Sequence, residues 1–332
     1  MPAPLTDEVL LRLIESRGDP VSGQGLARDL GVTRAAVWKC VETLRRDGYP
    51  VESVPARGYR LAGDPRGLRP GEVLARLTTR RLGRPVRHLE SVDSTNREAE
   101  RWALEGAPEG ALVVADHQDA GRGRLGRSWV DRKGHSLLLS LVLRPDLPAA
   151  QAPALTYVAS VALAETLGRW IPRNAIEIKW PNDVLVAGGK VAGILLEMRC
   201  EAQRVDHVIL GVGINVGGRP EDLPADLRAP ATTVAACASS PPHRLAVLCA
   251  FLQAMEDGYE RFLARGYDDL RAAWNRWFRM AGQRLRVRTA AATVEGVALG
   301  LGPSGALLLD RGDGCTEAVL AGDLESGTLR TP

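Results

Sequence analysis

Cysteine and aromatic residues are scarce in this chain of 332 residues, and long apolar runs are missing. Its five cysteines are Cys40, Cys200, Cys237, Cys249 and Cys315. They are scattered, odd in number and form no Cys-x-x-Cys pair, which argues against a disulfide framework and a zinc site and fits a cytoplasmic protein. No apolar run is long enough to cross a bilayer, and the N-terminus lacks the basic and apolar regions of a signal peptide, so we expect no membrane partner.

A strong excess of charge of one sign is also missing. The net charge of +3 neither requires nor excludes a polyanionic partner, so any argument for nucleic-acid binding has to come from local charge. A charged fraction of 25% and a hydrophobic fraction of 45% are typical of globular proteins. The length exceeds that of one ordinary core, so we expect two or three domains.

Residues 1–64 have the pattern of three helices followed by a hairpin. Apolar residues recur at helical spacing in residues 9–14 and 37–44. Ser22 and Thr33 precede the second and third helices as N-caps, and Gly31 separates the two. Residues 51–54 and 59–61 can pair across a turn that contains Gly58. The pattern predicts a winged helix-turn-helix domain.

Basic residues gather on the third helix and the wing. The five that we expect to contact DNA are Arg34, Lys39, Arg45, Arg46 and Arg57. A helix in the major groove with phosphate contacts from its flanks would use this distribution. The alternative is a small packing domain with a solvated polar face, and the bases that would be contacted do not follow from the sequence.

Beyond a linker at residues 65–72, strands and helices alternate through residues 73–280. We expect strands at 86–89, 111–115, 136–143, 176–180, 184–186, 191–197 and 207–216, and helices at 95–104, 152–170, 243–263 and 267–280. Thr95 and Glu98 have capping-box spacing at the start of the first of these helices. Because hairpins outnumber crossovers, the pattern favours an α+β domain with a mixed sheet. Residues 281–332 predict a small all-β domain with strands at 283–288, 293–299, 306–309 and 317–321.

Residues Gly121–Trp129 alternate glycine with arginine in the order Gly-Arg-Gly-Arg-Leu-Gly-Arg-Ser-Trp. Glycine allows close approach of the backbone, and arginine offers a planar cation that matches phosphate or carboxylate. Such a loop is suited to closing over an anion. Its Gly-x-Gly-x-x-Gly spacing also fits a dinucleotide fingerprint, but the following residues have no helical period, which that motif requires. A merely solvated basic loop is the other alternative.

Three polar clusters lie at expected strand ends or turns. They are Ser94-Thr95-Asn96, Gln118 with the Arg-Gly loop, and Lys179–Asp183 with Lys190. Taken singly, each has a structural explanation: helix capping for Ser94 and Thr95, a turn for Asp183, and a strand-end charge for Lys190. A scaffold that presents all three on loops would be typical of a binding site.

Together these motifs resemble the biotin–protein ligases, and in particular the bifunctional type that also represses biotin genes. The resemblance extends from the helix-turn-helix to the C-terminal strands. Its strongest motifs are residues 93–96, Gln118 with 121–129, 179–183, 189–195 and 211–215. It implies a class II synthetase-like biotin/lipoate ligase fold followed by an SH3-like β-barrel. Leu125 stands where the family can have another arginine.

The resemblance implies a two-step reaction. Biotin and Mg-ATP form biotinyl-5′-AMP and pyrophosphate, and biotin then passes to a lysine of a carrier domain in a biotin-dependent carboxylase. The implied biotin-binding residues are Ser94, Thr95, Asn96, Gln118, Arg122, Gly123, Arg124 and Lys190. The implied nucleotide-binding residues are Arg122, Arg127, Trp129, Lys179, Asn182 and Asn215. Lys190, Arg124 and Asp183 are the implied catalytic residues, and no resident metal site is expected.

The implied partners are the biotin carboxyl carrier domain, operator DNA and a second copy of the chain when the adenylate is bound. A lipoate–protein ligase would share the fold and the adenylate chemistry. Two further alternatives are a ligase without repressor activity and a transcription factor that only senses a metabolite. The alternatives differ in whether pyrophosphate is released with biotin or lipoate, and in whether operator DNA is bound.

Overall fold

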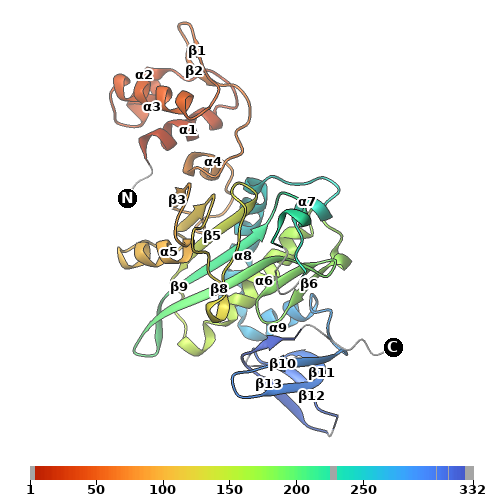
Figure 1. Ribbon diagram of the computed structural model, residues 1–332. Coiled ribbons are helices and arrows are strands. Elements are labelled where there is room, and N and C mark those ends of the chain that lie inside the picture. The colour runs from red at the N-terminus through yellow and green to blue at the C-terminus, as the bar shows by residue number, and fades with distance from the viewer. Residues whose placement is uncertain (1–3, 225–229, 304, 313, 326–332) are drawn as a thin grey trace.

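The computed structural model describes residues 4–224, 230–303, 305–312 and 314–325. The N-terminal helices and their hairpin lie at one end of the molecule, a large sheet with its helices lies in the middle, and a small β domain lies at the other end (Figure 1). Among the described residues, no helix has both the length and the apolar character needed to cross a bilayer.

The N-terminal domain has the expected winged helix-turn-helix elements. They are α1 (Leu5–Glu15), α2 (Gly23–Asp29), α3 (Arg34–Arg46), β1 (Val51–Val54) and β2 (Gly58–Leu61). Ser22 Oγ accepts the Gly25 N–H at 3.3 Å, and Thr33 Oγ1 accepts the Ala36 N–H at 3.2 Å, so both predicted caps are confirmed. The strands pair antiparallel as a wing. A separate core of side chains such as Leu10, Val37 and Leu44 holds the domain together.

The segment expected to be a linker is partly helical. Helix α4 (Pro70–Leu74) begins inside it, and Leu68 is buried before the helix. The Arg69 guanidinium pairs with Asp7 at 3.1 Å and with Asp47 at 2.6 Å, both in the N-terminal domain. Residues 65–72 are therefore more than a flexible tether, and the exact domain bounds stay a prediction.

The central sheet has seven strands in the order β3-β4-β5-β9-β8-β7-β6. Their bounds are β3 (Val86–Leu89), β4 (Leu112–Ala115), β5 (Ser136–Leu143), β6 (Ile176–Lys179), β7 (Asp183–Val186), β8 (Gly189–Glu201) and β9 (Arg204–Asn215). β3 and β4 are parallel and the other neighbours are antiparallel. This confirms the mixed sheet, and the strands expected at 184–186 and 191–197 pair as β7 and β8 across the turn at Ala187-Gly188.

Helices cover both faces of this sheet. They are α5 (Thr95–Leu104), α6 (Ala154–Leu167), α7 (Val234–Cys237), α8 (Arg244–Arg265) and α9 (Tyr267–Asn275), with 3-10 turns at Ala149–Gln151, Arg173–Ala175 and Pro220–Asp222. Trp102 of α5 packs in one apolar cluster with Val113, whereas Leu112 and Val114 belong to the cluster of α6 and α8. Because successive strand side chains point to opposite faces, α5 lies on one face and α6 and α8 lie on the other.

The capping box predicted at Thr95 and Glu98 is wrong. Ser94 is the N-cap of α5, and no side-chain cap hydrogen bond forms there. Thr95 donates instead to Gln118, which is 23 residues away in the sequence. Glu98 pairs with Arg87 and Arg101. The local signature is outweighed by contacts that only the folded chain brings together.

The C-terminal domain is the expected small β domain. It contains β10 (Arg284–Arg288), β11 (Thr293–Leu301), β12 (Leu307–Asp310), β13 (Thr316–Val319) and β14 (Asp323–Leu324). These strands form one antiparallel sheet in the order β13-β12-β11-β10-β14. The two-residue strand β14 lies at the edge of the sheet and places Asp323 opposite Arg288.

Candidate functional site

One cavity of about 670 Å³ is lined by the central sheet, the Arg-Gly loop and the edge of the C-terminal domain. Every residue for which the sequence predicted a ligand or catalytic role lines it. These residues are Ser94, Thr95, Asn96, Gln118, Arg122, Gly123, Arg124, Arg127, Trp129, Lys179, Asn182, Asp183, Lys190 and Asn215. The three polar clusters, which lie between Ser94 and Lys190 in the sequence, thus form one site.

The start of α5 forms a buried polar floor in this cavity. Gln118 Oε1 accepts the Thr95 N–H at 2.8 Å and the Thr95 hydroxyl at 3.0 Å. Ser140 Oγ lies 2.9 Å from Thr95 Oγ1 and 2.7 Å from Asn96 Oδ1. Asn96 Nδ2 donates to Glu197 Oε2 at 2.7 Å. Because a carboxylate only accepts, Glu197 fixes which side of the Asn96 amide faces the sheet.

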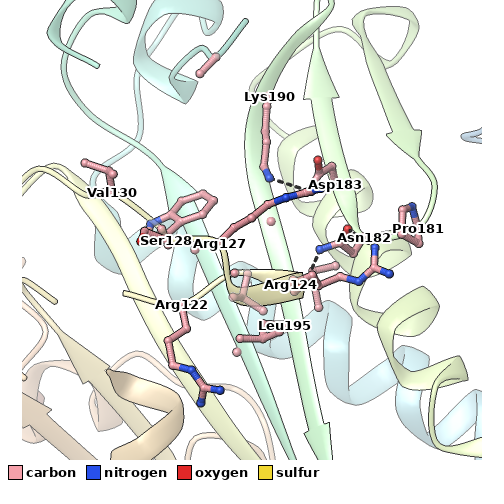
Figure 2. A pocket seen from close by; sticks show the side chains of 18 of the residues that line it. Arg122, Arg124, Arg127, Ser128, Val130, Pro181, Asn182, Asp183, Lys190 and Leu195 are labelled. Atoms are coloured by element: carbon pink, nitrogen blue, oxygen red, sulfur yellow. Dashed lines mark hydrogen bonds and ion pairs between the residues drawn. The ribbon is translucent and has the colours of Figure 1, made fainter. Parts of the chain in front are cut away.

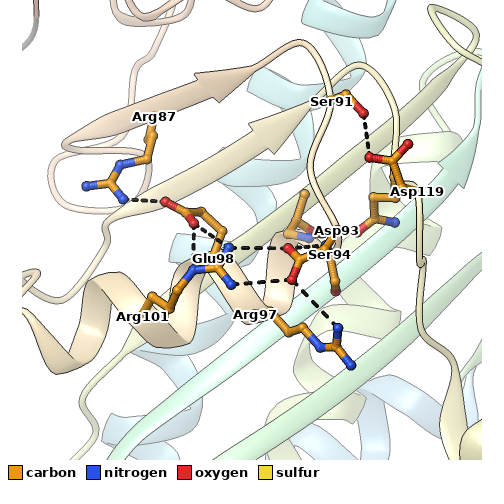
Figure 3. A network of polar contacts seen from close by, with 10 residues as sticks. Arg87, Ser91, Asp93, Ser94, Arg97, Glu98, Arg101 and Asp119 are labelled. Atoms are coloured by element: carbon orange, nitrogen blue, oxygen red, sulfur yellow. Dashed lines mark hydrogen bonds and ion pairs between the residues drawn. The ribbon is translucent and has the colours of Figure 1, made fainter.

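A charged network outside the cavity fixes the turn that carries this floor (Figure 3). Asp93 Oδ1 accepts the Ser94 N–H at 2.7 Å, and the Asp93 carboxylate pairs with Arg101 and Arg97. The hydrogen bond from Arg101 is the main reason that the pKa of Asp93 lies below its ordinary value. Asp93 therefore acts as an ionised anchor for Ser94.

The Arg-Gly loop is closed on itself by backbone hydrogen bonds. Trp129 N–H donates to Gly121 O at 2.9 Å, and Gly123 N–H donates to Arg127 O at 2.7 Å. A Cβ at Gly121 would lie 2.4 Å from the Trp129 carbonyl oxygen, so the loop needs glycine there. Leu125, which stands where the family can have another arginine, has φ of 55° and is 73% exposed. It does not line the cavity, so an arginine at this position would not belong to the cavity lining described here.

Two strand glycines make room for the Trp129 ring. A Cβ at Gly213 would lie 2.5 Å from Trp129 Cε2, and one at Gly193 would lie 3.1 Å from Cζ3. The Lys190 ammonium lies 5.6 Å from the centre of the same ring, within reach of a cation–π contact. The buried Trp129 Nε1 has no hydrogen-bond partner among the described residues. A flat ring with a spare donor is suited to stacking on a base or an apolar ligand.

Lys190 and the Asn182-Asp183 turn face each other across neighbouring strands (Figure 2). Lys190 Nζ lies 2.7 Å from Asp183 Oδ1. Asn182 Nδ2 donates to Ile194 O at 2.7 Å, and its Oδ1 accepts from Arg124 Nη1 at 3.4 Å. Arg122 points away from this group and pairs with Glu197 at 2.8 Å. The loop therefore divides its cations between two parts of the cavity.

The charge of the cavity suits a polyanion. Six lining residues are cations, namely Arg122, Arg124, Arg127, Lys179, Lys190 and Arg288. Three are carboxylates, namely Asp183, Asp323 and Glu325. Within the part of the chain that the structure describes, no group of three or more His, Cys, Asp or Glu residues is placed to hold a metal ion. The buried Asn215 Oδ1 lacks a partner in the same residues, whereas its Nδ2 donates to Thr232 O.

Four residues of the site were missed by the sequence analysis. Ser140 and Glu197 lie in strands whose apolar neighbours indicated only core packing. Asp131 has a fully buried side chain that accepts from the Gln118 N–H at 3.1 Å and contacts His117 at 2.9 Å, and so closes the base of the Arg-Gly loop. Asp323 reaches the cavity from the C-terminal domain. An acidic residue inside an apolar strand, as at Glu197, is the one signal that could have been noticed.

Asp116, at the end of β4, contributes to stability through His88 and Arg244. Burial disfavours the Asp116 anion, but the hydrogen bond with His88 at 3.0 Å and the ion pair with Arg244 at 2.7 Å outweigh burial and lower the pKa of Asp116 to about 2 from 3.8. A carboxyl with a lowered folded-state pKa stabilises the fold above its unfolded pKa, and this contribution is lost as the pH falls toward 2.

We therefore expect Asp116→Asn to lower the free energy of unfolding by about 2 kcal/mol at pH 7. The difference from the unmodified protein should shrink between pH 4 and pH 2. Urea unfolding at several pH values measures it. Asp146→Asn is the control, because Asp146 is 90% exposed in its pair with Arg204. If Asp116→Asn stays less stable by the same amount down to pH 2.5, the ionised Asp116 carboxylate is not the source of the difference.

Three family models match the chain. The Biotin/lipoate A/B protein ligase family matches residues 88–215, an HTH domain matches residues 6–60, and the Biotin protein ligase C terminal domain matches residues 281–325. The first covers most of the cavity, the second covers the winged helix, and the third includes Asp323.

Whole-chain relatives point the same way. The Bifunctional ligase/repressor BirA of Bacillus subtilis (strain 168) is 38% identical over 319 residues, which cover 96% of this chain and 98% of the relative. The protein of that name from Escherichia coli (strain K12) is 29% identical and covers 95% of this chain and 96% of its own length. The structure of the biotin protein ligase from Aquifex aeolicus with biotin and ATP matches with a TM-score of 0.61 and 26% identity, over 72% of this chain and 97% of that one. The chain therefore belongs to the biotin–protein ligase family, among its bifunctional ligase/repressor members.

Proposed function

We propose that this chain is an ATP-dependent biotin–protein ligase that also represses transcription through its winged helix. The observation that carries the enzymatic part is the meeting of the Ser94–Asn96 turn, the Arg-Gly loop and Lys190 around one cationic cavity. A carboxylate and a triphosphate repel each other, and a preorganised set of cations allows both to come within reaction distance.

Biotin is assigned to the polar floor. Ser94, Thr95, Asn96 and Gln118 offer hydroxyl and amide groups that suit the ureido ring of biotin. Arg122, Gly123 and Arg124 form one wall, and the carboxylate end of biotin is directed to Lys190. This orientation follows from charge. Lys190 is a cation beside Lys179, Asn182 and Asp183, the cluster assigned below to the nucleotide (the nucleotide cluster), whereas the floor is uncharged apart from Glu197.

The nucleotide is assigned to the opposite side of the cavity. Trp129 offers a face for the adenine ring, and Asn215 offers a buried acceptor without a partner. Lys179 and Arg127 are assigned to the phosphates, and Asn182 to their orientation. Arg122 would join them only after it leaves its pair with Glu197. Magnesium would arrive with ATP and meet Asp183, whose carboxylate is the acidic group next to Lys190. ATP with its magnesium ion is a substrate here and leaves as AMP and pyrophosphate.

In the first step, a biotin carboxylate oxygen attacks the α-phosphorus of ATP. The bond to the β-phosphate oxygen breaks, pyrophosphate leaves with that electron pair, and biotinyl-5′-AMP remains. Lys190 is placed to contact both the carboxylate and the α-phosphate, and Arg124 to hold the biotin side of the same groups. Their positive charge stabilises the transition state, where the negative charge of the two substrates is closest.

In the second step, the neutral amine of a carrier lysine attacks the carbonyl carbon of the mixed anhydride. The amide bond forms, the bond to phosphate oxygen breaks, and AMP leaves. Asp183 is the acceptor that we assign to the proton released by the lysine. Water would compete as a nucleophile, so the Arg-Gly loop must cover the adenylate until the carrier arrives.

Pyrophosphate release from the purified chain tests the assignment. With ATP, we expect release with biotin and transfer of biotin to a carrier domain, and at most weak release with lipoate. Faster release with lipoate would instead support a lipoate–protein ligase. If neither biotin nor lipoate causes pyrophosphate release, the result would support the alternative of a transcription factor that only senses a metabolite.

Operator binding is assigned to the exposed face of α3 and to the wing. Arg34, Lys39, Arg46 and Arg57 are exposed there. Arg45 differs, because its guanidinium already donates to Val51 O at 2.8 Å, to Glu42 at 2.6 Å and to Ser53 at 2.8 Å. We therefore propose that Arg45 fixes the wing against α3, and that the other four contact DNA.

Arg57→Ala should weaken binding to operator DNA and to DNA of unrelated sequence by about the same factor, because a wing-tip arginine contacts phosphate and carries no base specificity. The slope of log affinity against log salt should fall by about one. Fluorescence anisotropy with operator DNA at several salt concentrations measures both. Arg265→Ala, which removes an exposed cation of α8, is the control. An unchanged slope for Arg57→Ala would remove the wing from the interface.

Regulation is assigned to the adenylate. We propose that biotinyl-5′-AMP promotes dimerisation across the central sheet, which doubles the DNA contacts and so raises operator affinity. Operator binding and sedimentation with and without the adenylate test this together. Equal affinity in both states would leave a ligase whose DNA binding is not regulated by biotin.

A further inference from the structure

Asp323 of the C-terminal domain contacts two arginines of the Arg-Gly loop. The carboxylate pairs with Arg127 through both oxygens, one of them 3.3 Å from Arg127 Nη1. Arg124 Nη1 lies 3.8 Å from Asp323 Oδ1. Arg127 and Asp323 are 196 positions apart in the sequence, so this contact joins two domains in the lining of the cavity.

This contact differs from an ordinary surface ion pair in burial. The Asp323 side chain is 17% exposed and the Arg124 side chain is 25% exposed. Exposed ion pairs contribute little because water screens them, whereas a carboxylate with little access to water depends on its partners. Two cations that converge on one such group restrict the positions that the loop can take.

The backbone around Asp323 is itself fixed. Asp323 pairs with Arg288 and Leu324 pairs with Val287 in the β10–β14 ladder. Glu325 N–H donates to Arg286 O at 3.0 Å. A Cβ at Gly322 would lie 2.8 Å from the Arg288 carbonyl oxygen, so the turn into β14 fits tightly against β10. Asp323 is thus presented to the loop from a rigid edge.

We propose that Asp323 is a positioning residue that holds Arg127 toward the nucleotide side of the cavity and Arg124 at the junction where the biotin carboxylate meets the α-phosphate. A guanidinium has five N–H donors, so an arginine that keeps Asp323 on one edge still has donors for a phosphate on the other. Arg124 also reaches Asn182 Oδ1 at 3.4 Å, which places it between Asp323 and the nucleotide cluster. The C-terminal domain thereby takes part in ATP binding through the loop.

The inference rests on the proposed ligase function and adds to it the residue that orders the loop arginines. Asp323→Asn keeps the size of the side chain and removes its charge. We expect its KM for ATP to rise about five- to tenfold with a smaller change in kcat, because the arginines bind phosphate less well when their orientation is lost. Hydrogen exchange of residues 121–130 should be faster in the variant without ligand.

Three further variants sharpen the experiment. Asp323→Glu restores a carboxylate and should recover most of the ATP affinity. Arg127→Gln combined with Asp323→Asn should cost less than the sum of the two single changes, because they remove the same contact. Glu317→Gln breaks a 2.5 Å pair with Arg311 in the same domain, and neither residue lines the cavity, so it should leave KM for ATP and loop exchange unchanged.

The proposal is overturned if Asp323→Asn leaves both the KM for ATP and loop exchange as in the unmodified protein. It is also overturned if Glu317→Gln raises the KM for ATP equally, since the effect would then reflect the stability of the β domain. Loop exchange needs no turnover. If the unmodified protein fails to release pyrophosphate, the proposed function fails, and exchange in Asp323→Asn still decides whether the carboxylate orders the loop.

Discussion

Replacing Lys190 by alanine is expected to reduce pyrophosphate release about 1000-fold at saturating biotin and ATP. Lys190 is placed between the two anionic substrates, and a preorganised charge at that position contributes most in the transition state. Its removal also leaves the Asp183 carboxylate without the cation that lies 2.7 Å away. The uncompensated carboxylate then repels the two anionic substrates that must meet there. Release of pyrophosphate measures the first step without requiring a carrier.

Lys133→Ala is the matched control for this change. Lys133 is exposed, lies shortly after the Arg-Gly loop and does not line the cavity. It should release pyrophosphate as the unmodified protein does. Circular dichroism and urea unfolding should show that both variants are folded. Release within tenfold of the unmodified rate by folded Lys190→Ala would remove Lys190 from the catalytic role assigned to it.

Gly211→Ala should weaken biotin binding about 100-fold and leave ATP binding nearly unchanged. A Cβ on Gly211 would lie 2.0 Å from Asn96 Oδ1 and 2.8 Å from its Cγ. The amide cannot simply turn aside, because Ser140, Leu195 O and Glu197 all bond to it in a buried position. Loss of these bonds corresponds to about 3 kcal/mol. Titration calorimetry with each ligand separates the two affinities.

Gly168→Ala tests whether any glycine-to-alanine change has this effect. Gly168 follows α6 with helical φ of −61°, and the nearest atoms to an added Cβ lie 3.4 Å away. Alanine fits there and should be neutral or slightly stabilising. A biotin affinity of Gly211→Ala within threefold of the unmodified protein would mean that the position of Asn96 does not control the floor.

Much of the fold follows from local patterns in the sequence. Thr33 and the apolar period after it predict α3 because capping and helical burial act over a few residues. The Ala187–Gly189 turn predicts the β7–β8 hairpin for the same reason. Ends were less accurate: the helix expected at 267–280 ends at Asn275, and the one expected at 152–170 covers Ala154–Leu167. The end of a helix depends on tertiary contacts as well as on propensity.

The site was predictable where residue type and position agreed. Arginine among glycines, and lysine after a glycine turn, indicated anion binding before any contact was known. Glu197 was missed because its apolar neighbours in β8 resemble those of any core strand, and its role depends on Asn96 from α5. Asp323 could not be found locally, since a two-residue strand has no periodicity and its partners lie at the other end of the catalytic region. Thr95 shows the reverse error. Thr95 and Glu98 have the spacing of a capping box, but the folded chain forms no such box.

Arg69 has a consequence for dividing this chain into parts. Arg69, the N-cap residue of α4, pairs with Asp7 and Asp47 of the winged helix, and the Asp7 side chain is only 5% exposed. Excising residues 1–64 would remove both of these anions and uncover the side of α4 that packs on α1. A shortened ligase would therefore lose part of its own scaffold together with its hold on DNA, and any drop in its activity would report on both.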